Sequence, residues 1–216
     1  MDRFVPQFQG QDWVDGMRVL HVYALPREDV DRDLLALTQQ VRPHMQSYPI
    51  DPVTSETGFA ELHLTLEMIA DAPATDISET ERAELVAALA REVAPLPPIS
   101  TQVGPPLGNV AGVVLDVYPD DEVVVLQDRV RAAVRSARGE AALRHSGGRL
   151  HLQAGYSFGA TSSDPLNGVL RNEVATRRAP LEIDRVHLLD VQWGLAGDTG
   201  GWRMSWAPVA EVRLEG

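Results

Sequence analysis

Two short segments of the sequence combine side chains that could do chemistry with the alternation of a β-strand. They are Glu61–Leu66, with the sequence Glu-Leu-His-Leu-Thr-Leu, and Arg149–Ala154, with the sequence Arg-Leu-His-Leu-Gln-Ala. In each, a histidine lies on the polar face of the strand and a hydrogen-bonding side chain follows two residues later on that face. Because the pattern occurs twice, we expect two imidazoles to meet across one cleft.

His63 and His151 suit the cleavage of a phosphodiester by general acid–base catalysis. One imidazole can accept a proton from water while the other donates a proton to the departing oxygen. The unperturbed pKa of histidine lies near neutrality, so both protonation states are accessible. The hydroxyl of Thr65 can hydrogen-bond a non-bridging phosphate oxygen, and Gln153 stands at the matching position of the second segment. This scheme needs no metal ion and no cofactor.

The paired pattern of histidine, any residue, threonine or serine, then an apolar residue resembles the two-histidine phosphoesterase superfamily. The resemblance covers roughly residues 17–213, and it is strongest to the 2′-5′ RNA ligase-like branch, which includes cyclic phosphodiesterases. It implies an enzyme that acts on a 2′,3′-cyclic phosphate or a 2′-5′ phosphodiester of a nucleotide or RNA end. His63-Leu64-Thr65-Leu66 fits the pattern fully. In the second copy, Gln153 replaces the hydroxyl residue and Ala154 replaces the bulkier apolar residue.

Gln153 keeps a second hypothesis open. A glutamine amide can donate to a phosphate oxygen, but it is longer than a hydroxyl side chain, and losing one well-placed donor can cost on the order of 10²–10³ in rate. The alternative is a catalytically degenerate member that binds a nucleotide or phosphorylated ligand without turnover. A third hypothesis, a module with no ligand, predicts that the two histidines lie far apart.

Three further residues are candidates for substrate binding. Arg149 shares the face of His151 and could clamp a phosphate, although an ion pair with Glu61 or another acid is an equally good interpretation. Tyr23 and Tyr118 could form an aromatic floor for a base, and core packing is at least as good an interpretation of both.

Metal sites and other nucleotide sites lack support in the sequence. No His-Glu-x-x-His segment is present, the histidines are scattered, and there is no cysteine. The glycine-rich segment 194–201 lies between two predicted strands, so it indicates a hairpin turn and not a phosphate-binding loop. No Gly-x-Ser-x-Gly segment indicates a serine nucleophile.

Composition favours a soluble globular protein. Of the 216 residues, 44% are apolar and 23% are charged, and the net charge is −12. Such a charge argues against a broad duplex-DNA surface, but it permits a pocket for one phosphate group. No signal peptide and no apolar run of membrane-spanning length is visible. We therefore expect a cytoplasmic monomer with a small nucleotide or RNA end as its partner and no contact with a membrane.

Hydrophobic periodicity predicts a strand–helix–strand plan that occurs twice. Val19–Tyr23 resembles Val114–Tyr118, which would make Tyr118 the counterpart of Tyr23. Strict alternation also places Glu67 on the face of His63, and Tyr156 on the face opposite His151. Expected strands are 17–24, the segment with His63, 113–118, the segment with His151, 181–193 and 202–214; expected helices lie near 30–41, 79–93, 121–138 and from 164 onward.

The predicted fold class is α+β. Its duplicated strand–helix–strand units form two mostly antiparallel half-sheets around a central cleft, with helices on the outside. We expect residues 1–16 to form an N-terminal arm and residues 17–216 to form a single bilobal domain, with approximate halves 17–100 and 101–216.

Overall fold

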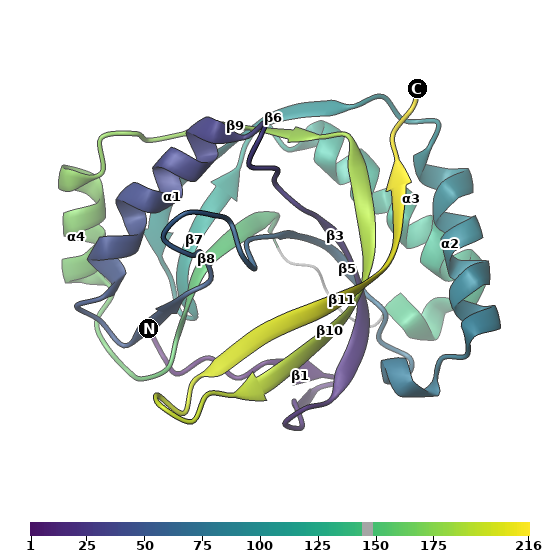
Figure 1. Cartoon of the computed structure of the whole chain (residues 1–216), viewed down its shortest axis with the longest axis horizontal. Coiled ribbons are helices and arrows are strands. Elements are labelled where there is room, and N and C mark those ends of the chain that lie inside the picture. Colours follow the sequence, from purple (N-terminus) through teal and green to yellow (C-terminus); the bar gives the residue numbers. More distant parts are fainter. Residues whose placement is uncertain (144–148) are drawn as a thin grey trace.

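A computed structural model describes residues 1–143 and 149–216 (Figure 1). Its helices, in chain order, are α1 (Arg32–Met45), the 3-10 turn η1 (Ala74–Asp76), α2 (Glu79–Val93), α3 (Asp121–Arg138), the 3-10 turn η2 (Glu140–Leu143) and α4 (Asp164–Glu173). Its strands are β1 (Gln7–Phe8), β2 (Gln11–Asp12), β3 (Arg18–Ala24), β4 (Ile50–Pro52), β5 (Leu64–Met68), β6 (Ile99–Gly108), β7 (Gly112–Val117), β8 (His151–Ser157), β9 (Ala179–Ile183), β10 (Arg185–Leu195) and β11 (Trp202–Arg213).

The main sheet is antiparallel and consists of two half-sheets. Its strand order is β11-β10-β3-β5-β8-β7-β6-β9, and β4 adds to β8 as a ninth strand. The halves meet between β5 and β8, where the pairing is limited to Leu64 opposite Leu152. Helices α1 and α4 lie at one side of the molecule and α2 and α3 at the other (Figure 1). The predicted α+β fold with two half-sheets and outer helices is therefore confirmed.

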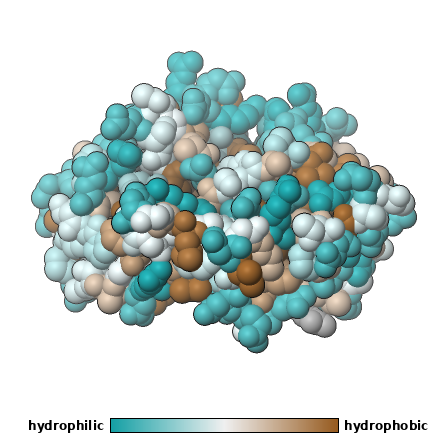
Figure 2. Space-filling view, turned by 60° about the horizontal axis from the view of Figure 1, so that its bottom comes forward, coloured by the Kyte–Doolittle hydropathy of each residue, from teal (hydrophilic) through white to brown (hydrophobic). Residues whose placement is uncertain are grey.

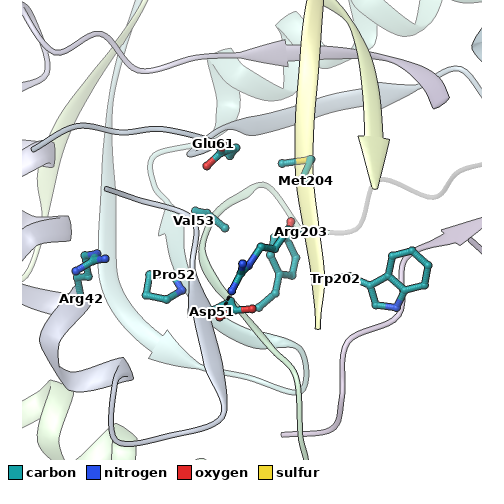
Figure 3. Close-up of a pocket in the computed structure, with 9 residues that line it drawn as sticks. Arg42, Asp51, Pro52, Val53, Glu61, Trp202, Arg203 and Met204 are labelled. Atoms are coloured by element: carbon teal, nitrogen blue, oxygen red, sulfur yellow. Dashed lines mark hydrogen bonds and ion pairs between the residues drawn. The ribbon is translucent and has the colours of Figure 1, made fainter. Parts of the chain in front are cut away.

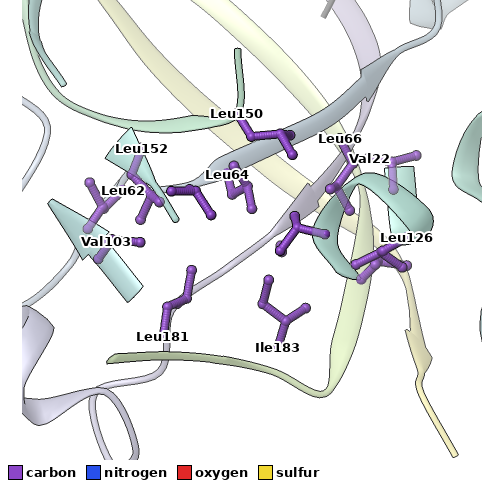
Figure 4. Packing of buried hydrophobic residues seen from close by; sticks show 14 of the residues in the cluster. Val22, Leu62, Leu64, Leu66, Val103, Leu126, Leu150, Leu152, Leu181 and Ile183 are labelled. Carbon is purple, nitrogen blue, oxygen red and sulfur yellow. The ribbon is translucent and has the colours of Figure 1, made fainter. Parts of the chain in front are cut away.

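One hydrophobic core joins the helices to the sheet. Alternate strand residues point toward the helices, as expected for strands buried on one face. Leu64, Leu66 and Leu152 belong to this cluster, together with Leu126 of α3 (Figure 4). The same cluster includes residues of both halves, so a single core supports both histidine segments.

Local signals explain where the helices begin and end. Ser78 and Glu81 form a capping box at the start of α2, in which each side chain accepts a hydrogen bond from the backbone N–H of the other. Gly139 follows α3 with φ at +82°, a conformation that glycine adopts without strain. Helix α1 continues to Met45, two residues past the predicted stop at Pro43.

Two elements differ from the sequence-based expectation. The predicted strand 181–193 is interrupted at Asp184 and forms β9 and β10; β9 lies at one end of the sheet order and β10 is second from the other end. Strand β6 was not expected, because prolines are unfavourable inside strands. Its Pro105 and Pro106 lie beyond the residues of β6 that pair with β9. The absence of their N–H groups therefore costs no hydrogen bond to β9.

The N-terminal segment 1–16 packs on the face of the sheet that points away from the helices, here called the inner face. It contains the β1–β2 ribbon, and Phe8 and Trp13 are buried in a second cluster with Tyr23 and Trp193. On the side shown in Figure 2, apolar side chains form small groups among hydrophilic ones. Across the described residues, no helix combines the length and apolar character needed to cross a membrane.

Candidate functional site

The junction of the two half-sheets brings the four motif side chains together. Leu64 and Leu152 face each other and point into the core. Their neighbours along each strand must point to the inner face. Because the two strands run antiparallel, the residue before Leu64 lies opposite the residue after Leu152, and the residue after Leu64 lies opposite the residue before Leu152. His63 therefore lies across from Gln153, and Thr65 lies across from His151, at the roughly 5 Å between Cβ atoms usual for such neighbours.

Both histidines are held by the same hydrogen bond. Nδ1 of His63 lies 2.7 Å from the carbonyl oxygen of Glu61, and Nδ1 of His151 lies 2.6 Å from that of Arg149. A carbonyl oxygen can only accept, so Nδ1 carries the proton in each ring. In the neutral imidazole this leaves Nε2 with a free lone pair. The two histidine segments thus hold their imidazoles in the same tautomer.

His63 lies in an aromatic environment. Its ring stacks on Tyr23 with centroids 4.1 Å apart, and Trp206 meets it edge-on at 5.8 Å. Burial, and to a smaller extent the charge of the nearby His151, lower the pKa of His63 to about 4, and the bond to the Glu61 carbonyl partly opposes them. His63 is therefore neutral at pH 7. His151 is more exposed than His63.

Thr65 lies beside Tyr23 on the inner face. The hydroxyl groups of the two residues interact, and the Tyr23 hydroxyl also donates to the sulfur of Met204 at 3.7 Å. Burial raises the pKa of Tyr23 well above its usual value, so its ring stays a neutral phenol. Thr65 is half-buried and Tyr23 is buried, which places the threonine nearer to solvent.

Gln153 uses its amide within its own strand. Its Nε2 donates to the carbonyl oxygen of Gly155 at 2.7 Å, and the side chain is 5% exposed. Gly112 approaches the same carbonyl with φ at +144°, and a Cβ there would lie 2.0 Å from that oxygen. Only glycine fits this approach.

A β-bulge follows each histidine at the same position. Leu66 has no partner between the pairs that Thr65 and Glu67 make with β3, and Ala154 has none between the pairs that Gln153 and Gly155 make with β7. A bulge adds one residue and reverses the faces beyond it. The strict alternation expected from the sequence is therefore wrong after this point.

The reversal moves two side chains to the faces opposite those predicted. Glu67 points toward α3, where it pairs with Arg131, and it is fully buried. Gln127 of α3 donates to the unpaired carbonyl of Leu66 at 3.0 Å. In the second copy, Tyr156 reaches the inner face, where its ring lies 5.0 Å from that of Trp193.

Two cavities flank the histidine pair. The first, of about 310 Å³, is lined by Glu61, two residues before His63, and by Met204, whose sulfur accepts from the Tyr23 hydroxyl (Figure 3). Of its two arginines, Arg203 is paired with Asp51 and Asp198, and Arg42 lies 4.0 Å from Glu56. The second cavity, of about 400 Å³, is lined by Pro105, Leu107, Asn109, Val114, Asp116, Arg149 and His151.

Arg149 and Tyr118 lie toward the His151 side. Arg149 forms two ion-pair contacts of 2.6 Å with Asp116, so the acid that partners it is not Glu61. Tyr118 is 55% exposed, and the guanidinium of Arg178 lies 5.4 Å from its ring centre. Tyr23 stacks on His63, whereas Tyr118 has a separate environment, so the structure brings only one of the two tyrosines to the pair.

The strand register also corrects the internal alignment of the two copies. Thr65 pairs with Tyr23, while the matching Gln153 pairs with Val114. Val114, and not Tyr118, is therefore the structural counterpart of Tyr23. The second half-site lacks both the hydroxyl and the stacked ring of the first.

Sequence reasoning missed Trp206 and Tyr156. Trp202, Met204 and Trp206 alternate along a predicted strand, and this period of two indicates an aromatic face. Gly155 inside a strand is a recognised sign of a bulge and could have placed Tyr156 on the inner face. Within residues 1–143 and 149–216, no three His, Asp or Glu side chains gather in a way that could hold a metal ion.

No protein-family model and no curated protein sequence matches the chain. Solved structures do. TT0787 of Thermus thermophilus is 16% identical with a TM-score of 0.63, and the match covers 92% of this chain and 98% of that one. A structure described as a phosphoesterase is 14% identical with a TM-score of 0.60, covering 93% and 99%. Escherichia coli LigT complexed with 3′-AMP is 12% identical with a TM-score of 0.60, also covering 93% and 99%.

These matches span nearly the whole of each chain and concern the fold. The resemblance expected from the sequence is therefore confirmed at the level of fold: the chain is folded like LigT and like the structure described as a phosphoesterase.

Proposed function

We propose that the chain is a phosphoesterase that cleaves a 2′,3′-cyclic phosphate or a 2′-5′ phosphodiester of a nucleotide or RNA end, with His63 and His151 as its acid–base pair. The observation that carries the proposal is the identical hydrogen bond from each Nδ1 to a backbone carbonyl two residues earlier. Two imidazoles with the same tautomer, on neighbouring strands and the same face, suit transfer of one proton in and one proton out.

The residues are assigned the following roles for a cyclic phosphate. Nε2 of His63 accepts a proton from water as the water oxygen attacks phosphorus, because burial keeps this ring neutral. His151, protonated on both nitrogens at the start, donates its Nε2 proton to the ribose oxygen as the bond from phosphorus to that oxygen breaks. The product is a phosphomonoester, and the two histidines have exchanged protonation states.

Thr65 is the proposed phosphate-holding donor. Its half-buried hydroxyl lies on the inner face next to both rings, where it can hydrogen-bond a non-bridging oxygen as negative charge grows there. No metal ion takes part in this scheme. The 3′-AMP bound by LigT, which shares the fold, supports a nucleotide as the ligand.

A specific observation favours the second candidate, a protein that binds such a ligand without turnover. The amide donor of Gln153 is already bonded to Gly155, so the second half-site offers the phosphate no equivalent of Thr65. Calorimetry that shows saturable nucleotide binding, with no product after hours, would favour this candidate over the enzyme.

Purified protein incubated with a panel of 2′,3′-cyclic nucleotides and 2′-5′ dinucleotides tests the proposal. We expect His63→Ala and His151→Ala to abolish turnover, and Thr65→Val to lower kcat by about 10²-fold, since one transition-state donor is removed. His44→Gln, on the outer helix α1, is the matched control and should retain activity. Turnover that survives both alanine substitutions would exclude the mechanism.

A further inference from the structure

The second cavity adjoins a third one that is lined by three arginines. The third cavity, of about 360 Å³, shares Pro105 and Leu107 with the cavity that holds His151. Beyond this shared wall it is lined by Pro106, Asn167, Arg171, Arg177 and Arg178. It therefore lies next to the cavity that holds His151 and extends from β6 to Arg171, near the carboxyl end of α4.

These three arginines differ from most others in the chain. The sequence has no lysine, so all 19 basic side chains are arginines, against 31 acidic ones. Most described arginines pair with a carboxylate, as Arg149 does with Asp116 and Arg203 does with Asp51.

No ion pair to a carboxylate is recorded for Arg171, Arg177 or Arg178 in the part of the chain that the structure describes. Glu173, two residues after Arg171, lies 3.9 Å from His44. Glu182, four residues after Arg178, accepts a hydrogen bond from Ser100. An acidic protein thus keeps three exposed, uncompensated positive charges in one cavity. This charge suits an anion larger than one phosphate group.

The orientation of two of the arginines is partly fixed. Arg177 donates to the carbonyl oxygens of Leu170 and Arg171 at the end of α4. Arg178 lies over the ring of Tyr118, whose other side is available because the residue is 55% exposed. Guanidinium groups bind phosphate oxygens in pairs, and an exposed ring next to them can stack with a base.

The strand order gives the distance from the catalytic pair. His151 lies opposite Asp116 on β7, Val117 pairs with Val103 on β6, and Val103 pairs with Ala179, which follows Arg178. Three strand spacings of about 4.8 Å separate His151 from Arg178, which is roughly 14 Å. A chain of a few nucleotides can cover that distance, whereas a mononucleotide cannot.

We propose that the cavity formed by Arg171, Arg177 and Arg178, with Tyr118 at its edge, binds the backbone of a single-stranded oligonucleotide whose reacting end lies between His63 and His151. The inference rests on the proposed function, since it identifies the preferred substrate as an oligonucleotide end. An oligonucleotide is preferred over a mononucleotide because its additional phosphates, away from the reacting one, contact these arginines.

The test measures binding and turnover separately. Binding of a fluorescent six-nucleotide RNA with a 2′,3′-cyclic end is followed by anisotropy in a His63→Gln/His151→Gln background, where no substrate is consumed. The added substitutions are Arg171→Gln and Arg178→Gln, because Arg177 also bonds the end of α4. Arg91→Gln, an exposed arginine on α2 in the other half, is the matched control.

We expect the double arginine variant to weaken RNA binding by about tenfold and to reduce the slope of log K against log salt by about 1.4, since each lost contact to a single strand contributes about 0.7. In the otherwise unchanged enzyme, the same pair should raise KM for the RNA and leave KM for a mononucleotide 2′,3′-cyclic phosphate unaltered. Arg91→Gln should change neither.

Three results would overturn the inference: unchanged RNA affinity, an equal effect of Arg91→Gln, or equal displacement of the RNA by an acidic peptide of the same charge. Failure of the proposed function looks different. In that case no phosphodiester is turned over, yet RNA binding still depends on Arg171 and Arg178, which would support the oligonucleotide site by itself.

Discussion

At the scale of single residues, the two histidines share a backbone contact but not an environment. Each ring is oriented by a carbonyl from its own strand, so orientation needs no carboxylate partner. His63 is enclosed by Tyr23 and Trp206, while His151 is half-exposed. The asymmetry leaves one ring neutral and the other with access to solvent, which suits the acid–base pair proposed above.

Burial of His63 makes stability depend on pH. The pKa of His63 is about 4 in the folded chain, and it is about 6.5 in an unfolded one. Because the unfolded state binds the proton more readily, the stabilisation is complete above pH 6.5 and is lost as pH falls toward 4. We expect the free energy of unfolding to fall by about 3 kcal/mol more between pH 7 and pH 4 than it does in His63→Gln. Urea titrations at several pH values measure the free energy of unfolding of both proteins. The same dependence on pH in the two proteins would contradict the prediction.

The sequence predicted which residues near each histidine share the site. It did not predict which residues of the neighbouring strands face them. His63, Thr65, His151 and Gln153 lie together because two leucine faces fix two strands in one register. Tyr118 was expected beside Tyr23, but similarity of short apolar strings does not encode which residue of a strand faces which neighbour. That depends on pairing across the sheet.

At the scale of elements, helix α3 is attached to the strand that carries Thr65. Gln127 bonds the carbonyl that the bulge leaves unpaired, and Arg131 neutralises Glu67, which the bulge turns toward the helix. These contacts fix the strand just after Thr65. If Thr65 holds the phosphate as proposed, Gln127 and Arg131 of α3 are positioning residues for it.

Removal of Arg131 should be costly and dependent on pH. In Arg131→Met, the carboxylate of Glu67 loses its counter-charge in a buried position, which costs about 3 kcal/mol. Burial already raises the pKa of Glu67, and the loss of Arg131 raises it further. A raised pKa in the folded state means that stability is lost as pH rises, so Arg131→Met should be more destabilised at pH 8 than at pH 5. Urea unfolding at both values measures this, with Arg129→Met, an exposed neighbour on α3, as control.

Helices were more predictable than strands for a physical reason. A capping box or a terminal glycine acts locally, so the ends of α2 and α3 follow from the sequence. Strand β6 carries two prolines and is stabilised by partners distant in sequence, which no local pattern reveals. Bulges depend on the same distant pairing.

At the scale of the whole molecule, one core serves both halves. Val22 and Leu64 of one half-sheet belong to the same buried cluster as Leu115 and Leu152 of the other. Neither half can expose its apolar face without exposing that of its neighbour. The limited pairing between β5 and β8 is thus compensated by shared packing.

Unfolding should therefore occur in one step. The four tryptophans report on the inner-face cluster and β11, whereas far-ultraviolet circular dichroism reports on all helices. Their transitions in urea should coincide, as they do for a cooperative domain. A fluorescence transition that clearly precedes the loss of helix would show instead that the halves unfold separately.

The single residue pair between the half-sheets also acts as a pivot. Any rotation of one half against the other about Leu64 and Leu152 displaces distant strands most and the residues next to the axis least. His63 and His151 are each one residue from that axis, so the distance between their rings changes little in such a motion. The flanking cavities lie farther out and change shape with it. In the proposed enzyme, this geometry would keep the distance between the two imidazoles constant while the cavities adapt to substrates of different size.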